Sequence, residues 1–320
     1  MTYDYSFGGL RIRSDFAMPG LIDAVPGQGG EPVLRITAEV GAPLVPDHIW
    51  YAWSQGNRME LGEYGGRWLI RSRFDGSFLI DRDGGALHLV AQSLPPEPEV
   101  LEILLRRVLP RAPMLHGAIA IHAASLACGG AGAMLIGQSG AGKSTLCASL
   151  SRHPGWQVLG DDTALMWSPK TPMLGAGART VCLWPESRDG LGVGTERSEF
   201  LANGSGKTRT FVEGSAPPSR VPLRAVVFLN RSADTALPEL RRLDLAEAIG
   251  LTVPQLIRFN PHGDSASERI DSVLGVTAAL RVCTAWSLNY PSTYPALQQV
   301  EALLRTLLMS EQGYCVASQG

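Results

Sequence analysis

The sequence predicts a mixed α/β protein in two parts: a smaller, mainly antiparallel β domain over residues 1–111 and an α/β domain over residues 112–320. Two observations support this division. In the first part, apolar and polar residues alternate as they do in half-buried strands. After residue 117, short apolar runs take turns with segments of helical spacing, which is the order of elements in a sheet covered by helices.

The composition is that of a globular chain, with 45% hydrophobic and 18% charged residues over 320 positions and a formal net charge of −2. A near-zero charge gives no general attraction to nucleic acid or to an anionic membrane, so we expect neither as a partner. Five cysteines without CxxC spacing disfavour a disulfide framework and a cysteine zinc site. The first residues carry acids and no apolar run typical of a secretory signal, so the expected location is the cytoplasm.

Each part of the chain has its own pattern. The runs "RWLIRSRF" (67–74) and "GSFLIDRDGGALHLVAQ" (76–92) alternate and are separated by turn residues, whereas "EVLEILLRRVL" (99–109) has helical spacing and ends at Pro110. Residues 118–137 predict a β-hairpin that runs into a glycine-rich loop. A helix is expected over 144–152, strands over 156–162, 179–184, 223–230 and 281–290, and helices over 245–259 and 294–309. The uncharged stretch 112–142 consists of Ala, Gly, Ser and His broken by Gly129-Gly130, so we interpret it as buried strands and not as a membrane span.

The strongest motif is "GQSGAGKS" at 137–144, which fits the phosphate-binding P-loop (Walker A) pattern G-x-x-x-x-G-K-[ST] between an apolar strand and a helix. Glycines let successive backbone N–H groups point at phosphate oxygens, a lysine adds a point charge, and the serine hydroxyl is a magnesium ligand. The motif therefore predicts binding of ATP with Mg²⁺. The residues expected to contact the nucleotide here are Gly137, Ser139, Gly140, Ala141, Gly142, Lys143, Ser144 and Thr145.

Two acids, Asp161 and Asp162, end the strand "WQVL" in the run "LGDD". Carboxylates at the carboxyl end of a strand near a P-loop face the same crevice. One of the two could hold Mg²⁺ together with Ser144, and the other could accept the proton of an attacking hydroxyl while Lys143 neutralises the transferred phosphate. A helix cap or a turn is the structural alternative for such a pair.

Together these residues resemble the catalytic domain of the HPr kinase/phosphorylase family, a P-loop kinase domain related to phosphoenolpyruvate carboxykinases. "IHAASL" places His122 where that family has an active-site histidine, and "WPESRDGLG" places Glu186 where it has a metal-binding glutamate. "LGDD" matches its paired aspartates, the first of which is the family's catalytic acid/base. The resemblance therefore implies that Asp161 accepts the proton of the hydroxyl and that Asp162 holds Mg²⁺. The glutamate run is one residue longer here, Thr145 stands where the family often has an acid, and residues 1–110 do not match the family's usual N-terminal domain.

The resemblance implies an ATP-dependent kinase that phosphorylates a serine of a peptide or protein, and it also implies assembly into homo-oligomers. The shape is similar to relatives from peptide-biosynthesis clusters, some of which act on lasso-peptide precursors. The alternatives are a kinase for a sugar or metabolite and a regulatory module that binds ATP without consuming it.

A second Gly-Lys-Thr run, in "ANGSGKTRTF" (202–211), is not expected to be a second P-loop, because Leu201 stands where the first glycine is required. The surrounding segment 187–220 is long and polar. Long connections of this kind are uncommon unless they are functional or disordered. We expect Lys207 and Arg209 to close over the γ-phosphate or the acceptor; a solvated loop is the alternative.

Overall fold

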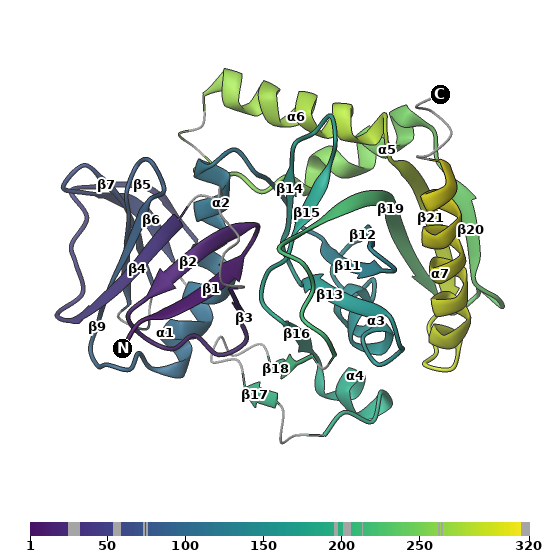
Figure 1. The fold of residues 1–320 in the computed structure, drawn as a ribbon, viewed down its shortest axis with the longest axis horizontal. Coiled ribbons are helices and arrows are strands. Elements are labelled where there is room, and N and C mark those ends of the chain that lie inside the picture. Colours follow the sequence, from purple (N-terminus) through teal and green to yellow (C-terminus); the bar gives the residue numbers. More distant parts are fainter. Residues whose placement is uncertain are drawn as a thin grey trace.

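The computed structural model describes residues 1–24, 33–53, 59–72, 74, 76–194, 198–200, 206–212, 214–261, 263 and 265–314. In this part of the chain two large sheets stand side by side, with short helices between them and longer helices around the second sheet (Figure 1). The architecture is therefore mixed α/β, as the sequence predicted.

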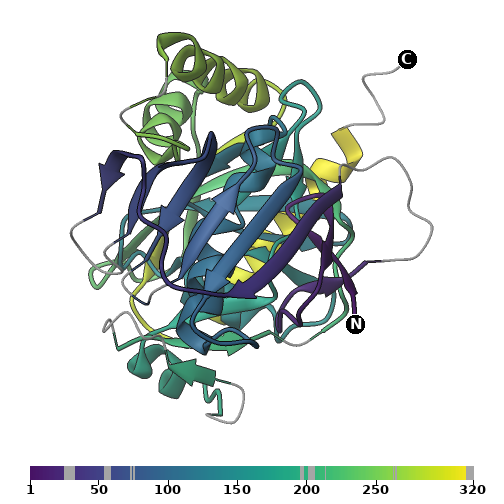
Figure 2. The same ribbon diagram turned by 90° about the vertical axis from the view of Figure 1, so that its left-hand side faces the viewer.

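The first sheet has the strand order β3-β1-β2-β4-β9-β8-β7-β6-β5. Neighbouring strands are antiparallel except for the β2–β4 and β4–β9 pairs, so this part is mainly antiparallel, as expected. Figure 2 looks onto this sheet, with the rest of the chain behind it. The strands are β1 (Tyr3–Phe7), β2 (Leu10–Ser14), β3 (Ile22–Asp23), β4 (Val33–Val40), β5 (His48–Ala52), β6 (Glu60–Tyr64), β7 (Arg67–Arg71), β8 (Ser77–Ile80) and β9 (Ala86–Ala91).

The predicted helix after the first sheet is present as α1 (Pro98–Ile103), which continues without a break into the π-helical turn η1 (Leu104–Val108); α2 (Arg111–Leu115) follows. Val100, Leu104 and Val108 are buried at four-residue spacing and join the apolar core of the first sheet. π-helical turns are rare and often stand at functional sites. This one carries Arg106, whose partners are described below. The boundary near residue 111 stays a prediction.

The second sheet has the order β10-β14-β15-β19-β12-β11-β13, and β21 continues it beside β19, followed by β20. The predicted hairpin is confirmed as the antiparallel β11–β12 pair, and β12, β19 and β21 run parallel. The strands are β10 (Ile119–Ile121), β11 (Ala124–Cys128), β12 (Ala131–Ile136), β13 (Trp156–Gly160), β14 (Ala164–Trp167), β15 (Met173–Gly175), β19 (Arg220–Ser232), β20 (Glu239–Arg242) and β21 (Thr284–Pro291).

Helices cover both faces of the second sheet. Ala133 and Leu135 of β12 point into the core under α3 (Lys143–Leu150) and α7 (Ala296–Tyr314), whereas Met134 and Ile136 point into the core under α5 (Leu245–Thr252) and α6 (Ala266–Leu280). Because β12 is covered on both faces, its sequence is continuously apolar and does not alternate. The 3₁₀ turn η3 (Val253–Gln255) follows α5, and α6 was not among the predicted helices.

A small third sheet of order β16-β18-β17 lies beside the second, formed by β16 (Thr180–Leu183), β17 (Ser198–Phe200) and β18 (Thr208–Phe211). The short helix α4 (Pro185–Gly190) follows β16. The segment expected to be a long polar connection thus contains regular structure in its described residues. Residues 195–197, 201–205 and 213 lie outside them.

The two large sheets contact each other through the β1–β2 turn. The Gly8 N–H donates to the Ala176 carbonyl at 2.6 Å, and the Trp167 indole N–H donates to the Gly8 carbonyl at 2.6 Å. A Cβ on Gly175 would come within 2.5 Å of the Gly8 backbone, so the close approach requires glycine. Cys128, Cys147 and Cys182 are buried free thiols. Within the described residues we find no helix that is both long and apolar enough to cross a membrane.

Candidate functional site

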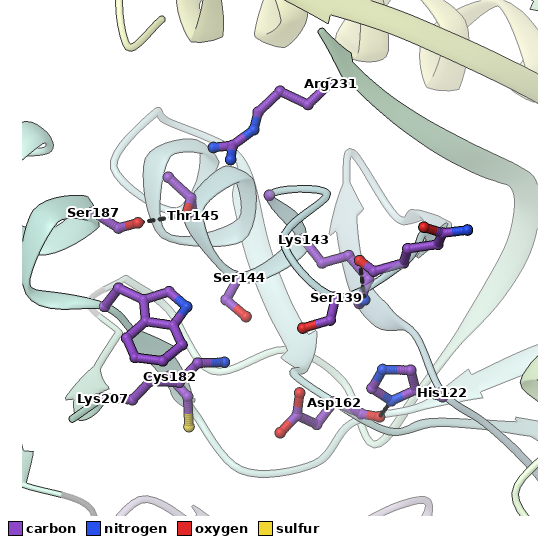
Figure 3. A pocket seen from close by; sticks show the side chains of 14 residues that line it. His122, Ser139, Lys143, Ser144, Thr145, Asp162, Cys182, Ser187, Lys207 and Arg231 are labelled. Carbon is purple, nitrogen blue, oxygen red and sulfur yellow. Dashed lines mark hydrogen bonds between the residues drawn. The ribbon is translucent and has the colours of Figure 1, made fainter. Parts of the chain in front are cut away.

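The carboxyl ends of β12, β13, β19 and β21 meet at one edge of the second sheet, because β12, β19 and β21 are parallel and β13 is antiparallel to β11. At this edge lies a cavity of about 210 Å³ (Figure 3). Its lining comes from the glycine-rich loop, the first turn of α3, the end of β13, and segments of the third sheet and α4. Open α/β sheets bind ligands at this kind of position.

The glycine-rich loop has the backbone that its sequence demands. Gly140 and Gly142 have φ of 86° and 88°, in the left-handed region that favours glycine. The Lys143 ammonium lies across the loop and donates to the carbonyls of Gly137 at 2.6 Å and Gln138 at 3.3 Å. Lys143 is thereby held at the cavity, at the N-terminus of α3, where the helix dipole adds to its charge.

Tyr290, at the end of β21, fixes the other side of the loop. Its hydroxyl donates to the Ala141 carbonyl at 2.6 Å, and burial raises the pKa of this phenol to about 12, so it remains a donor. A Cβ on Gly142 would stand 2.3 Å from the Tyr290 hydroxyl. Gly142 is therefore required twice, by its φ and by the close approach of a neighbouring strand.

Basic groups dominate the electrostatics of the cavity. Burial lowers the pKa of Lys143; Asp161 partly offsets this shift and the nearby Lys207 adds to it. Burial likewise lowers the pKa of His122, and the cations of Lys143 and Arg107 lower it further. Burial is the main cause of both shifts, and the neighbouring cations that add to them would be stabilised by an anion bound in the cavity.

Asp161 is engaged on both oxygens. The Ser144 hydroxyl donates to one oxygen at 2.9 Å and the Cys182 backbone N–H donates to the other at 2.8 Å. Asp161 is not among the residues that line the cavity. The hydroxyl–carboxylate pair of Ser144 and Asp161 therefore lies at the side of the loop, where it can share a metal ion.

Asp162 lines the cavity and has a φ of 68°, which is uncommon for a residue other than glycine. Its carboxylate is ion-paired with Arg106, and Arg106 also donates to Glu102 at 2.8 Å. The Arg106 side chain is 12% exposed. A buried chain of alternating charges thus runs from α1 to the end of β13 and holds the strained aspartate.

His122, between β10 and β11, has one defined tautomer. Its Nδ1 lies 3.0 Å from the carbonyl oxygen of Asp162, and a carbonyl only accepts, so Nδ1 carries the proton. The second ring nitrogen points away from that carbonyl toward the cavity (Figure 3). Because its pKa is lowered, the ring is neutral near pH 7 and presents an unprotonated nitrogen.

The predicted metal ligands are only partly brought together. Ser144 and Asp162 line the cavity, but Glu186 is exposed in α4 and lies outside the lining. Its neighbour Ser187 lines the cavity instead and accepts from the Thr145 hydroxyl at 3.1 Å. No cluster of three His, Cys, Asp or Glu side chains able to hold a metal occurs among the described residues.

Lys207 and Arg209 are separated by the structure. Lys207 lines the cavity, with its ammonium 5.2 Å from the centre of the Trp184 ring. Arg209 points elsewhere: it is 3% exposed in β18, lies 3.4 Å from Glu102 and is not part of the lining. The expectation that Arg209 closes over the nucleotide is corrected, because its side chain is buried and its guanidinium is paired with Glu102 in the interior, away from the cavity.

Several lining residues were not predicted. Arg231 follows the apolar run of β19. Cys182 lies in β16, Ser187 lies in α4, and Trp184 stands between these two elements. Arg231 could have been found, since the carboxyl end of a strand parallel to β12 must reach the loop edge. No pattern in the sequence indicated that Cys182 would line a cavity. Burial raises the pKa of its thiol to about 12, so Cys182 does not act as a nucleophile.

The residues fit a polyphosphate with a hard divalent cation. The left-handed backbone at Gly140 and Gly142, the Lys143 ammonium and the helix N-terminus supply donors and positive charge. Ser144 and Asp161 supply oxygen ligands of the kind magnesium prefers, and magnesium sites in such proteins take their other ligands from water and phosphate.

No family model matches the sequence, and no curated protein matches it. Among solved structures, the Hpr(Ser) kinase/phosphatase from Coxiella burnetii is similar over 63% of this chain and 99% of that chain, with a TM-score of 0.32 and 13% sequence identity. At this level of likeness, function must be argued from the site itself.

Proposed function

We propose that this protein is an ATP-dependent kinase that transfers the γ-phosphoryl group to a hydroxyl, namely a serine of a peptide or protein. The observation that carries the proposal is one cavity in which the glycine-rich loop and Lys143 face the neutral imidazole of His122 and the carboxylate of Asp162. A phosphate-binding loop alone indicates only that a nucleotide is bound. A proton acceptor beside that loop indicates that the phosphoryl group is transferred to a hydroxyl.

The chain's own residues would bind and align the phosphates. Backbone N–H groups of the loop and the N-terminus of α3 donate to phosphate oxygens, and Lys143 places its charge on the outer phosphates. Magnesium, when bound, neutralises charge on the transferring group, and Ser144 and Asp161 are the residues that would hold it. This proposal assigns Asp161 to the metal, whereas the sequence led us to expect it to accept the proton of the hydroxyl.

His122 takes the role of proton acceptor in this proposal. An unprotonated ring nitrogen would repel a phosphate oxygen but accepts a hydrogen bond from a hydroxyl, so it suits the incoming serine. The Asp162 carbonyl keeps the ring in the tautomer that leaves this nitrogen open, and Arg106 fixes Asp162. A loose transition state for phosphoryl transfer is stabilised mainly by aligned reactants and by positive charge near the transferred phosphate, and these residues supply both.

The test is transfer with purified protein, Mg²⁺-ATP and a serine-containing peptide, read as one added phosphate mass on the peptide and as ADP. Asp161→Asn should weaken binding of Mg²⁺-ATP, whereas His122→Gln should slow transfer with little change in ATP affinity. Consumption of ATP only with small metabolites would replace the peptide by a small-molecule acceptor. ATP binding without consumption by any acceptor would favour a regulatory module.

A further inference from the structure

A second cavity, of about 530 Å³, lies at the same edge of the second sheet. One wall is the turn between β19 and β20 (residues 233–237), and the other is the connection from β21 into α7 (residues 291–296). Its lining is apolar and uncharged, with prolines, alanines and Leu237 beside the hydroxyls of Thr235 and Thr293 and the amide of Gln299. This chemistry differs from that of the charged cavity at the glycine-rich loop.

The two cavities are joined by neighbouring residues of the same two strands. Arg231 lines the charged cavity, and Ala233, two residues further, lines the uncharged one. Tyr290 bonds to the glycine-rich loop, and the next residue, Pro291, lines the uncharged cavity. The Ser292 N–H donates to the Ser232 carbonyl at 3.1 Å, which holds the two walls at a fixed separation.

The charged cavity has two ends. His122 and Asp162 stand at one end, and Thr145 and Arg231 stand at the other, beyond the loop (Figure 3). Phosphoryl transfer requires the terminal phosphate near His122, so the rest of a nucleotide must leave toward Arg231. The charged cavity, at about 210 Å³, is below the roughly 300–1,000 Å³ of typical ligand pockets, so a whole nucleotide does not fit inside it.

We propose that the uncharged cavity binds the nucleoside half of the nucleotide whose phosphates lie on the glycine-rich loop. The inference rests on the proposed function, since it assumes a nucleotide in the charged cavity. Pro291, Pro295 and Leu237 offer apolar surface to a planar base, and the side chains of Thr235 and Gln299 can pair with its edge or with the ribose. Arg231 lies between the two halves and neutralises the phosphate nearest the ribose.

The experiment compares ATP with inorganic tripolyphosphate, both with Mg²⁺, by calorimetric titration of the full-length protein. Tripolyphosphate has the same three linked phosphates and no nucleoside, so it reports the charged cavity alone. Two variants fill the uncharged cavity from opposite walls, Ala236→Trp and Thr293→Trp; both positions are exposed, so folding tolerates them. Thr171→Trp, an exposed threonine in the β14–β15 turn, is the matched control.

Wild type should bind ATP more tightly than tripolyphosphate, and each filling variant should lose about tenfold or more in ATP affinity while its tripolyphosphate affinity stays within about twofold. Retained tripolyphosphate binding also shows that the variant is folded at the loop. Equal wild-type affinities for the two ligands, or filling variants that bind ATP like the control, would overturn the nucleoside site and leave the proposed function standing. Failure of wild type to bind either ligand would overturn both.

Discussion

Substitution of Gly142 tests whether the contact with Tyr290 shapes the glycine-rich loop. A Cβ there would stand 2.3 Å from the Tyr290 hydroxyl, whereas a Cβ on Gly140, at almost the same φ, would meet none of the described atoms within 4 Å. Gly140→Ala should therefore cost only the left-handed strain, about 1–2 kcal/mol. Gly142→Ala should add an overpacking cost of about 1–3 kcal/mol.

Tyr290→Phe identifies the source of that added cost. Once the hydroxyl is removed, the nearest atom from Tyr290 is Cζ at 3.6 Å, an ordinary contact. Tyr290→Phe alone should cost about 0.5–1.5 kcal/mol through the lost hydrogen bond to Ala141. Combined with Gly142→Ala it should cost less than the sum of the two single changes, by about 1 kcal/mol or more.

The assay is the free energy of unfolding from urea titrations, with tripolyphosphate affinity as a second readout of loop geometry. Two outcomes would refute the reasoning. In the first, Gly140→Ala and Gly142→Ala destabilise equally. In the second, the effects of Gly142→Ala and Tyr290→Phe are simply additive. Either result would mean that Tyr290 does not impose the requirement for glycine.

Three further predictions concern the cavity itself. Arg106→Met should slow transfer about tenfold to hundredfold with ATP affinity nearly unchanged, because Asp162 loses its ion-pair partner; normal transfer would make the pair purely structural. An NMR titration of the free protein should give His122 a pKa below the usual histidine value of about 6.5, because burial and nearby cations disfavour the charged ring. The His122 signal is identified as the one that disappears in His122→Gln, and a midpoint at or above about 6.5 would contradict this prediction. Lys207→Ala should slow transfer and leave ATP binding intact, because its ammonium lines the cavity beside Trp184; unchanged kinetics would show that this lysine has no part in closure.

The sign of the His122 effect on stability follows from the same shift. The unfolded chain binds a proton at His122 more readily than the folded chain does, so folding is favoured above about pH 6.5 and loses stability as the pH falls through 6.5 toward the lowered pKa. His122→Gln should remove this part of the acid sensitivity, which comparison of melting temperatures at pH 7.5 and pH 6 measures.

Much of the fold could be predicted from the sequence because it depends on local pattern. The β11–β12 hairpin, the helix α3 and the parallel strand β19 follow from apolar runs bounded by glycine and charge. The β1–β2 hairpin was missed although its signal is present: Gly8-Gly9, with φ of 61° and 83°, is a turn that joins two alternating runs. Helix α6 was also missed, although Ser265 and Glu268 form a capping box at its start.

By itself, the sequence determined the glycine-rich loop, because left-handed backbone at Gly140 and Gly142 is a local requirement that only glycine meets cheaply. Only the tertiary structure decided which charged side chains join that loop. Arg106 reaches Asp162 across 56 positions, Arg209 turns into the interior toward Glu102, and Glu186 stays at the surface. The conformation of the backbone is determined by residues that are neighbours along the chain. The partner of a charged side chain is determined by the packing of elements that are distant in sequence.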